Sequence, residues 1–303
     1  MADVRPHMNS IEAFFLPGDA SDPGYRNVRD LPHWREAKEF TESLWPAYRH
    51  MADPHFRTDA RNHFLQRFWE MYLACTLMER GIELHRVGDE GPEFFFCCES
   101  RRIWVEAVAP GPGTGPDQVP ETEYGKAYTV PTEKILLRFT SALRDKLLKR
   151  HSAIAKGILL PDEQVLLAIN SRGIPHAPYG AEMPYVAKAL LPFGSLSIDI
   201  NPKTREVTDT YYQFRPELQK QNLSSVATTA FLEAEYAAFV GVLHSGVDCA
   251  NHPTMLGGDF LLLHNPSALP LPRNIFSWCR QLEYLKDQLN EVPRSNPLLQ
   301  PTR

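Results

Sequence analysis

The stretch Gly91-Pro92-Glu93-Phe94, followed by Ile103-Trp104-Val105-Glu106-Ala107-Val108, decides the fold that the sequence predicts. Each segment belongs to a short apolar run, and the intervening Glu99-Ser100-Arg101-Arg102 has the composition of a tight turn. A hairpin through that turn brings the carboxyl groups of Glu93 and Glu106 close together. Two carboxylates held close need a cation or a proton, so the pair predicts a metal site.

The second run predicts a central strand. Alternate side chains along residues 103–108 point to opposite faces of a strand, and both faces are apolar apart from Glu106. We therefore expect Glu106 to be buried. A buried carboxylate must be protonated, paired or bound to a metal, because desolvating a bare one is prohibitive. A structural salt bridge is the alternative to a metal site.

A helix is predicted over residues 59–80, and Gly81 is a natural stop at its end. Its apolar stripe, with three- and four-residue steps, consists of Phe64, Phe68, Met71, Tyr72, Cys75 and Met78. Glu70 lies about 160 degrees from that stripe. Two interpretations are open for Glu70: a solvated helix surface, or an acid aimed at a site beside the sheet.

A second helix is predicted from Thr132, as its N-cap, to roughly Ile154. One arc of ~60 degrees holds Ile135, Phe139, Ala142 and Lys146, which places Lys146 within the apolar face. That lysine either snorkels along the edge of the core or points at the acidic pair. A separate basic face, formed by Lys134, Arg138 and Lys149, is either solvated or follows a phosphate backbone.

The remaining patterns predict one α/β domain over residues 58–291, with an N-terminal wrap (1–57) and a disordered tail (292–303). Short apolar runs predict an antiparallel meander of three strands over 82–87, 93–98 and 103–109, and Gln164–Asn170 predicts a buried strand. Further elements are expected as a short helix at 34–44, extra C-terminal strands at 195–200, 207–214, 237–244 and 260–264, and a last helix at 274–288. The loop 110–131 is rich in glycine and proline, and its spacing does not match a nucleotide-binding loop.

Composition limits the partners. The net charge of -5 gives no global attraction to nucleic acid, so binding DNA would need a local basic surface. No apolar run approaches the ~18 residues of a membrane span, and the first residues have no apolar signal region. Five cysteines favour reduced thiols and a cytoplasmic location. The half-motif Cys249-x-x-His252 has no partner pair, and Cys97 and Cys98 should point to opposite faces of a strand.

The order helix, three strands, helix, strand resembles the PD-(D/E)XK, or restriction-endonuclease-like, superfamily. Pro92-Glu93 opens one strand and Glu106 lies inside the next, as in the short motif of that superfamily. The likeness covers roughly residues 60–170 and implies a restriction-endonuclease-like αβββαβ core with a mixed sheet. The chain as a whole also resembles bacterial proteins.

The resemblance implies a role for several residues. Glu93 matches the first acid and Glu106 the second, and the two would bind magnesium or manganese. The superfamily's lysine position is occupied here by Val108, which cannot do that chemistry. Lys146 is the candidate for a relocated lysine, and Glu70 resembles the additional metal-binding acid that some members carry on the first helix.

The implied activity is metal-dependent hydrolysis of phosphodiester bonds in DNA, with Arg138 and Lys149 positioning the backbone of the substrate. The alternative is a catalytically inactive nuclease-like domain that binds nucleic acid or protein, which Val108 and the acidic net charge favour. An enzyme of another kind would use the histidines near predicted strand ends or loops: His176, His244, His252 and His264. No Gly-x-Ser-x-Gly or His-Glu-x-x-His signature accompanies them.

Overall fold

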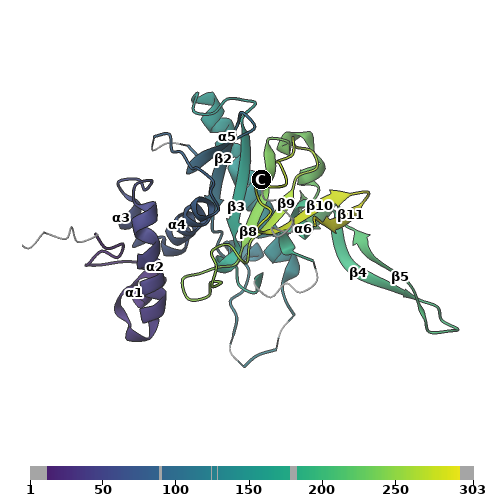
Figure 1. Ribbon diagram of the computed structural model, residues 1–303. Helices are drawn as coiled ribbons and strands as arrows, with labels where there is room; N and C mark the ends of the chain where they lie inside the picture. The colour runs from purple at the N-terminus through teal and green to yellow at the C-terminus, as the bar shows by residue number, and fades with distance from the viewer. Residues whose placement is uncertain (1–11, 89–90, 124, 128, 178–182, 294–303) are drawn as a thin grey trace, which may run out of the picture.

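A seven-stranded mixed sheet forms the centre of the computed structural model, which describes residues 12–88, 91–123, 125–127, 129–177 and 183–293 (Figure 1). In spatial order its strands are β1 (Phe94–Cys98), β2 (Arg101–Val108), β3 (Gln164–Asn170), β8 (Phe239–Ser245), β9 (Leu261–His264), β10 (Arg280–Leu285) and β11 (Gln288–Glu291). Strands β2, β3 and β8 are parallel, whereas β1, β9 and β11 each include an antiparallel pairing. The predicted α/β class and the extension of the sheet by C-terminal strands are confirmed.

The β1–β2 hairpin sets the relation between the two acidic residues. Its register pairs Phe94 with Val105, so continuing it by one pair places Glu93 across from Glu106. The turn residues Glu99 and Ser100 have φ of 47° and 64°, the left-handed conformation that a two-residue hairpin turn requires. Strand β2 lies between β1 and β3 with both faces buried, as its apolar pattern predicts.

Helix α4 (Phe64–Glu79) lies between the sheet and the N-terminal helices, which are α1 (Pro23–Asp30), α2 (Arg35–Tyr48) and α3 (Phe56–Ala60) (Figure 1). Every residue from 68 to 77 is buried, because the helix is covered on both sides. The predicted helix over 59–80 is correct at its end, where Gly81 has φ of 77°. At its beginning the chain instead forms two helices, and the carboxylate of Asp22 accepts the backbone N–H of Phe64 at 2.9 Å.

Helix α5 (Thr132–Ala155) covers the opposite face of the sheet, together with α6 (Tyr185–Leu190). Ile135, Phe139, Ala142 and Lys146 are all buried, so the predicted arc does face the core. Thr132 is the first helical residue and Pro131 is the N-cap, so the predicted cap is wrong by one position.

Two predicted elements are wrong. Residues 82–87 do not form a strand: Ile82 and Leu84 pack against the core, but only His85 pairs with the sheet, opposite Phe95. The last predicted helix is the β10–β11 hairpin, whose turn residues Lys286 and Asp287 have φ of 51° and 60°. Tertiary pairing with β9 overrides the helix-favouring composition of this segment.

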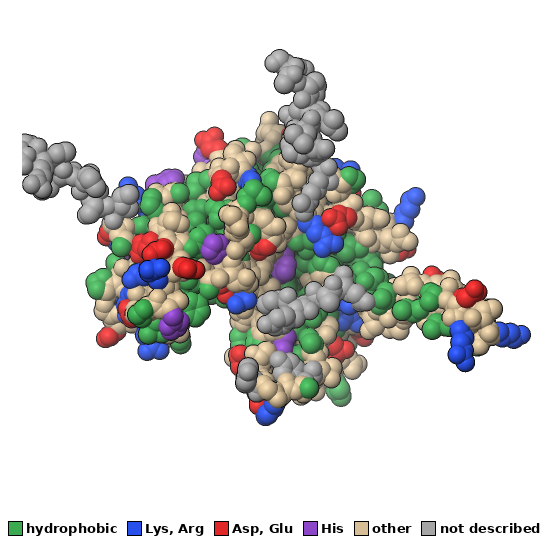
Figure 2. All heavy atoms as spheres, turned by 60° about the horizontal axis from the view of Figure 1, so that its bottom comes forward, with side chains coloured by type: hydrophobic (Ala, Val, Ile, Leu, Met, Phe, Trp, Pro, Cys, Tyr) green, Lys and Arg blue, Asp and Glu red, His purple; other side chains and the backbone are tan. Residues whose placement is uncertain are grey.

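Strands β4 (Phe193–Ile200) and β5 (Val207–Phe214) form at the predicted positions but make a separate hairpin that projects from the body (Figure 1). Figure 2 shows hydrophobic side chains along this arm and basic ones at its end. A third small sheet pairs β6 (Glu217–Gln219) with β7 (Ser225–Ala227).

The predicted tail begins too early. Val292 is buried and donates its backbone N–H to Gln281, and residues 294–303 lie outside the described part of the chain. Among the helices of the described residues, none has the length and apolar character needed to cross a membrane.

Candidate functional site

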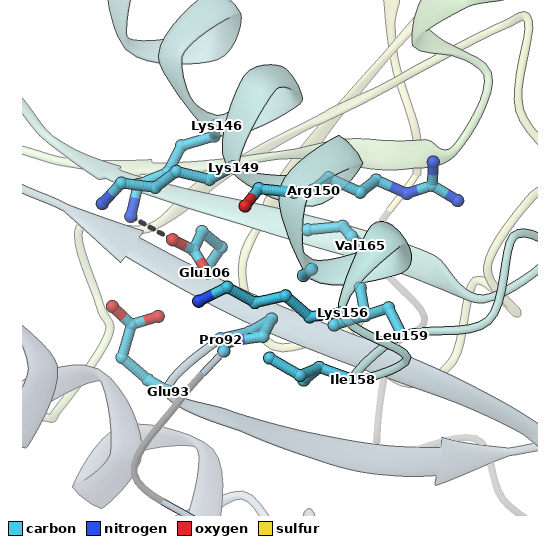
Figure 3. Close-up of a pocket in the computed structure, with 13 residues that line it drawn as sticks. Pro92, Glu93, Glu106, Lys146, Lys149, Arg150, Lys156, Ile158, Leu159 and Val165 are labelled. Carbon is cyan, nitrogen blue, oxygen red and sulfur yellow. Dashed lines mark hydrogen bonds and ion pairs between the residues drawn. The ribbon is translucent and has the colours of Figure 1, made fainter.

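The β1–β2 hairpin and helix α5 bring Glu93, Glu106 and Lys146 together (Figure 3). The ammonium of Lys146 donates to the Glu106 carboxylate, and also to the carbonyl oxygen of Ala107 at 3.1 Å. The carboxylate of Glu93 accepts the backbone N–H of Ala107 at 2.8 Å. The side chain just before β1, one from β2 and one from α5 therefore meet at one point, as the sequence predicts.

Burial and neighbouring charges together shift the pKa values of Glu93 and Lys146. Only 8% of Glu106 and 7% of Lys146 is exposed. Burial and the neighbouring charge of Glu106 raise the pKa of Glu93 to about 8, against the opposing effect of Lys146. Burial lowers the pKa of Lys146, but the charges of Glu93 and Glu106 outweigh this and raise it above its ordinary value. Lys146 is therefore an ammonium at neutral pH, and the raised pKa of Glu93 favours its protonated form there.

Glu70 also lies beside this point, on α4. It is 4% exposed, so the interpretation as a solvated helix surface is wrong. Its carboxylate accepts from the side chains of Gln66 at 2.8 Å and Arg67 at 2.7 Å. Gln66 in turn accepts the backbone N–H of Ala109 at 2.7 Å, which ties α4 to the end of β2. Glu70 thus belongs to a hydrogen-bonded support of the strand that carries Glu106.

Two cavities meet at the acidic residues. The smaller, about 340 Å³, is lined by Glu93, Glu106, Lys146 and Lys149 together with apolar side chains of the α5–β3 connection. The larger, about 590 Å³, is lined by Glu93, Lys146, Lys149, Glu70 and Arg138 among others. Glu93, Lys146 and Lys149 line both, so the candidate site lies where the cavities join. All the predicted site residues line one cavity or both.

Basic side chains surround the carboxylates. In Figure 3 the ammonium groups of Lys146, Lys149 and Lys156 point into the space that Glu93 and Glu106 face. Arg138 lies in the larger cavity and donates through Nε to the carbonyl oxygen of Gly111 at 2.9 Å. Arg138 thereby also holds the start of the long loop against α5.

Sequence reasoning missed Gln66, Arg67 and Lys156. Gln66 and Arg67 precede Glu70 by four and three positions, a spacing that puts side chains side by side on a helix and gives a usable signal. Lys156 follows Lys149 by two helical turns and lies just past the predicted end of the helix, at the C-cap of α5. Its place in the site follows from where α5 ends.

The oxygen ligands suit a hard divalent cation. Within the described ranges, no three His, Cys, Asp or Glu side chains are grouped to hold a metal ion, so the protein would supply two carboxylates, Glu93 and Glu106. Magnesium binds through one or two carboxylates and keeps several waters. When both carboxylates are ionised, Lys146 balances only one of them, and an added cation would remove the remaining charge.

Comparison with known proteins yields no match to any family model, curated protein or solved structure. The observed core runs α4, β1, β2, α5, β3. It differs from the predicted αβββαβ order because a single bridge at His85 replaces the first strand.

The four histidines of the alternative enzyme each have a different partner. His176 contacts the carbonyl oxygen of Pro120 at 3.0 Å, and His252 stacks on Phe40 with ring centroids 3.5 Å apart. His264 contacts Gln281 at 2.8 Å and His244 contacts Ser171 at 2.9 Å. Burial lowers the pKa of His244 to about 4, so it is neutral.

The cysteines give no sign of a zinc site. Cys249 is buried whereas His252 is exposed, and no metal-holding cluster occurs among the residues that the structure describes. Cys97 is exposed and Cys98 is buried, which confirms that they point to opposite faces of β1.

Proposed function

We propose that this protein hydrolyses phosphodiester bonds in nucleic acid with the help of a divalent cation, Mg²⁺ or Mn²⁺. The observation that carries the proposal is the meeting of Glu93, Glu106 and Lys146 where two cavities with basic walls join. A structural salt bridge explains the contact between Lys146 and Glu106, but it does not explain a second acid and further lysines around the same space. The resemblance to the restriction-endonuclease-like superfamily supports the same activity.

Glu93 and Glu106 would hold the cation. When bound, the cation would orient water and stabilise the negative charge that develops on the phosphate. The support formed by Glu70, Gln66 and Arg67 keeps the end of β2, and with it Glu106, in place.

Lys146 contributes charge. Its pKa lies above the ordinary value, so at neutral pH it stabilises negative charge and does not remove a proton from water. Lys149 would contact substrate phosphates from the rim shared by both cavities, and Arg138 would do so from the larger one. Glu93 would lose its proton on binding a cation, because a cation would stabilise the ionised carboxylate.

The test is cleavage of plasmid DNA, linear duplex DNA and single-stranded DNA with Mg²⁺ or Mn²⁺, and with a chelator. We expect metal-dependent cleavage of at least one substrate, and a loss of about 100-fold or more in Glu106→Gln. Glu99→Gln is the matched control, because Glu99 lies in the turn of the same hairpin and is exposed. Equal activity of Glu106→Gln and the parent would rule out this site.

The second candidate function is a nucleic-acid binding module that cuts nothing. The specific observation in its favour is that Lys146 already neutralises Glu106, so the pair is satisfied without a metal. Calorimetric titration with MgCl₂ and MnCl₂ separates the two functions. A binding module would take up neither cation, whereas the proposed hydrolase would bind at least one.

A further inference from the structure

The candidate site is recessed. Glu106 and Lys146 are both more than nine-tenths buried; Glu106 lines the smaller cavity and Lys146 lines both. A phosphate must enter one of these cavities before it can approach both groups. The shape of the substrate therefore decides whether it reaches the site.

The cavities have the size of small-molecule sites. Their volumes, about 340 and about 590 Å³, fall in the range of roughly 300 to 1,000 Å³ that encloses one small ligand. Each therefore has room for about one or two nucleotide units of a chain. A duplex carries a second strand and paired bases with each phosphate, and it does not fit into either space.

The lining of the smaller cavity matches a single strand in chemistry as well. Lys149 and Lys156 supply positive charge near the acids, and Ile158, Leu159 and Val165 supply an apolar wall at the other end (Figure 3). Lysine ammonium groups bind phosphates, and an apolar wall can pack against the face of an unpaired base. Bases in a duplex are stacked on their neighbours and offer no free face.

We propose that the substrate of this site is single-stranded nucleic acid, which passes the junction of the two cavities with its bases unpaired. This inference rests on the proposed function, since it names the substrate of the same site. The polar side chains that line the smaller cavity are mostly charged, so we expect binding to depend on lysine–phosphate contacts and to vary little with sequence. DNA and RNA share this chemistry, and both are used in the test.

The experiment measures binding of the full chain, with a chelator present, to fluorescent 20-mers by anisotropy. The probes are single-stranded DNA, single-stranded RNA of the same sequence and the matching DNA duplex. We expect at least one single strand to bind at least about tenfold more tightly than the duplex. Contacts from Lys149, Lys156 and Arg138 predict a slope of log K against log salt of about −2 for single strands.

The variant Lys149→Gln/Lys156→Gln should lower the magnitude of that slope by about 1.4 and weaken single-strand binding. Arg144→Gln is the matched control, because Arg144 is an exposed cation on the same helix that lines neither cavity. An unchanged slope in the double variant, or equal losses in the double variant and the control, would overturn the inference.

Cleavage of the same probes, assayed with Mg²⁺ and with Mn²⁺, separates this inference from the proposed function. Duplex bound and cut as well as the single strands would overturn the single-strand inference and leave hydrolysis standing. Tight binding of single strands without cleavage in the presence of either cation would support the selectivity of this site for single strands and overturn hydrolysis. Failure to bind either single strand would overturn the inference.

Discussion

Replacement of Lys146 by methionine tests the centre of the site. Methionine keeps an unbranched side chain but removes the ammonium, so Glu106 is left buried without its partner. Breaking a buried ion pair from one side costs about 3–5 kcal/mol, because an uncompensated charge remains. We therefore expect the free energy of unfolding of metal-free Lys146→Met to fall by about that amount at pH 7. The additional change Glu106→Gln should restore most of the loss.

Urea denaturation with and without MgCl₂ is the assay. If Glu93 and Glu106 bind the cation, Mg²⁺ replaces the missing charge and stabilises Lys146→Met more than the parent. A free cation concentration of 100 times Kd would return about 2.7 kcal/mol. Lys149→Met is the matched control, since Lys149 is exposed and lies one helical turn away, and its effect should stay within about 0.5 kcal/mol. A metal-free Lys146→Met as stable as the parent would refute the buried pair, and a loss that Mg²⁺ does not reduce would refute cation binding by the carboxylates.

Two further predictions follow from contacts at the edge of the site and from its protonation. Gly113→Ala should weaken nucleic-acid binding several-fold in anisotropy titrations, because a Cβ there would lie 2.9 Å from Nη1 of Arg138 at a φ of 87°. Gly111→Ala is the control, because a Cβ at Gly111 would meet nothing within 4 Å. An equal loss of binding in Gly113→Ala and Gly111→Ala would contradict the role of Arg138. The pKa of Glu93 is about 8 in the folded protein, well above the pKa of a glutamate in an unfolded chain. Between about pH 5 and 8 the folded state therefore binds more protons than the unfolded state. The free energy of unfolding of the metal-free protein should fall as pH rises through this range, by at most about 1.4 kcal/mol per pH unit. Urea titrations across this range should show a flatter profile for Glu93→Gln, and parallel profiles would count against the raised pKa.

The parts of the fold with strong local patterns were predictable. Ile135, Phe139 and Ala142 repeat at helical spacing, which predicts helix α5, and the same spacing directs Lys146 toward the sheet. The apolar residues on both faces of residues 103–108 predict that β2 is a central strand. Since register is fixed by the tight turn at Glu99, the proximity of the two acids followed from the same pattern.

The misassigned parts depend on distant contacts. Residues 280–291 are rich in residues that favour helices, but the pairing of β10 with β9 and with β11 makes them strands. In residues 82–87 apolar and polar side chains alternate, as they do in a strand. Ile82 and Leu84 pack against the core, but the segment makes only a single bridge to the sheet, at His85. The burial of Glu70 could not be read from α4 alone, because it depends on the end of β2, where Gln66 donates both to Glu70 and to the carbonyl oxygen of Ala107.

The position of the lysine shows what the site requires physically. The negative charge of the buried Glu106 carboxylate needs a positive group close to it in space. That group can come from any part of the chain. Val108 packs against the core on the α5 side of the sheet, two positions along the same strand. Lys146 reaches the Glu106 carboxylate from the helix above, and its stem lies among the apolar residues of α5. Val108, at the position where the resemblance implies a lysine, therefore does not by itself remove the positive charge from this site, because α5 supplies it.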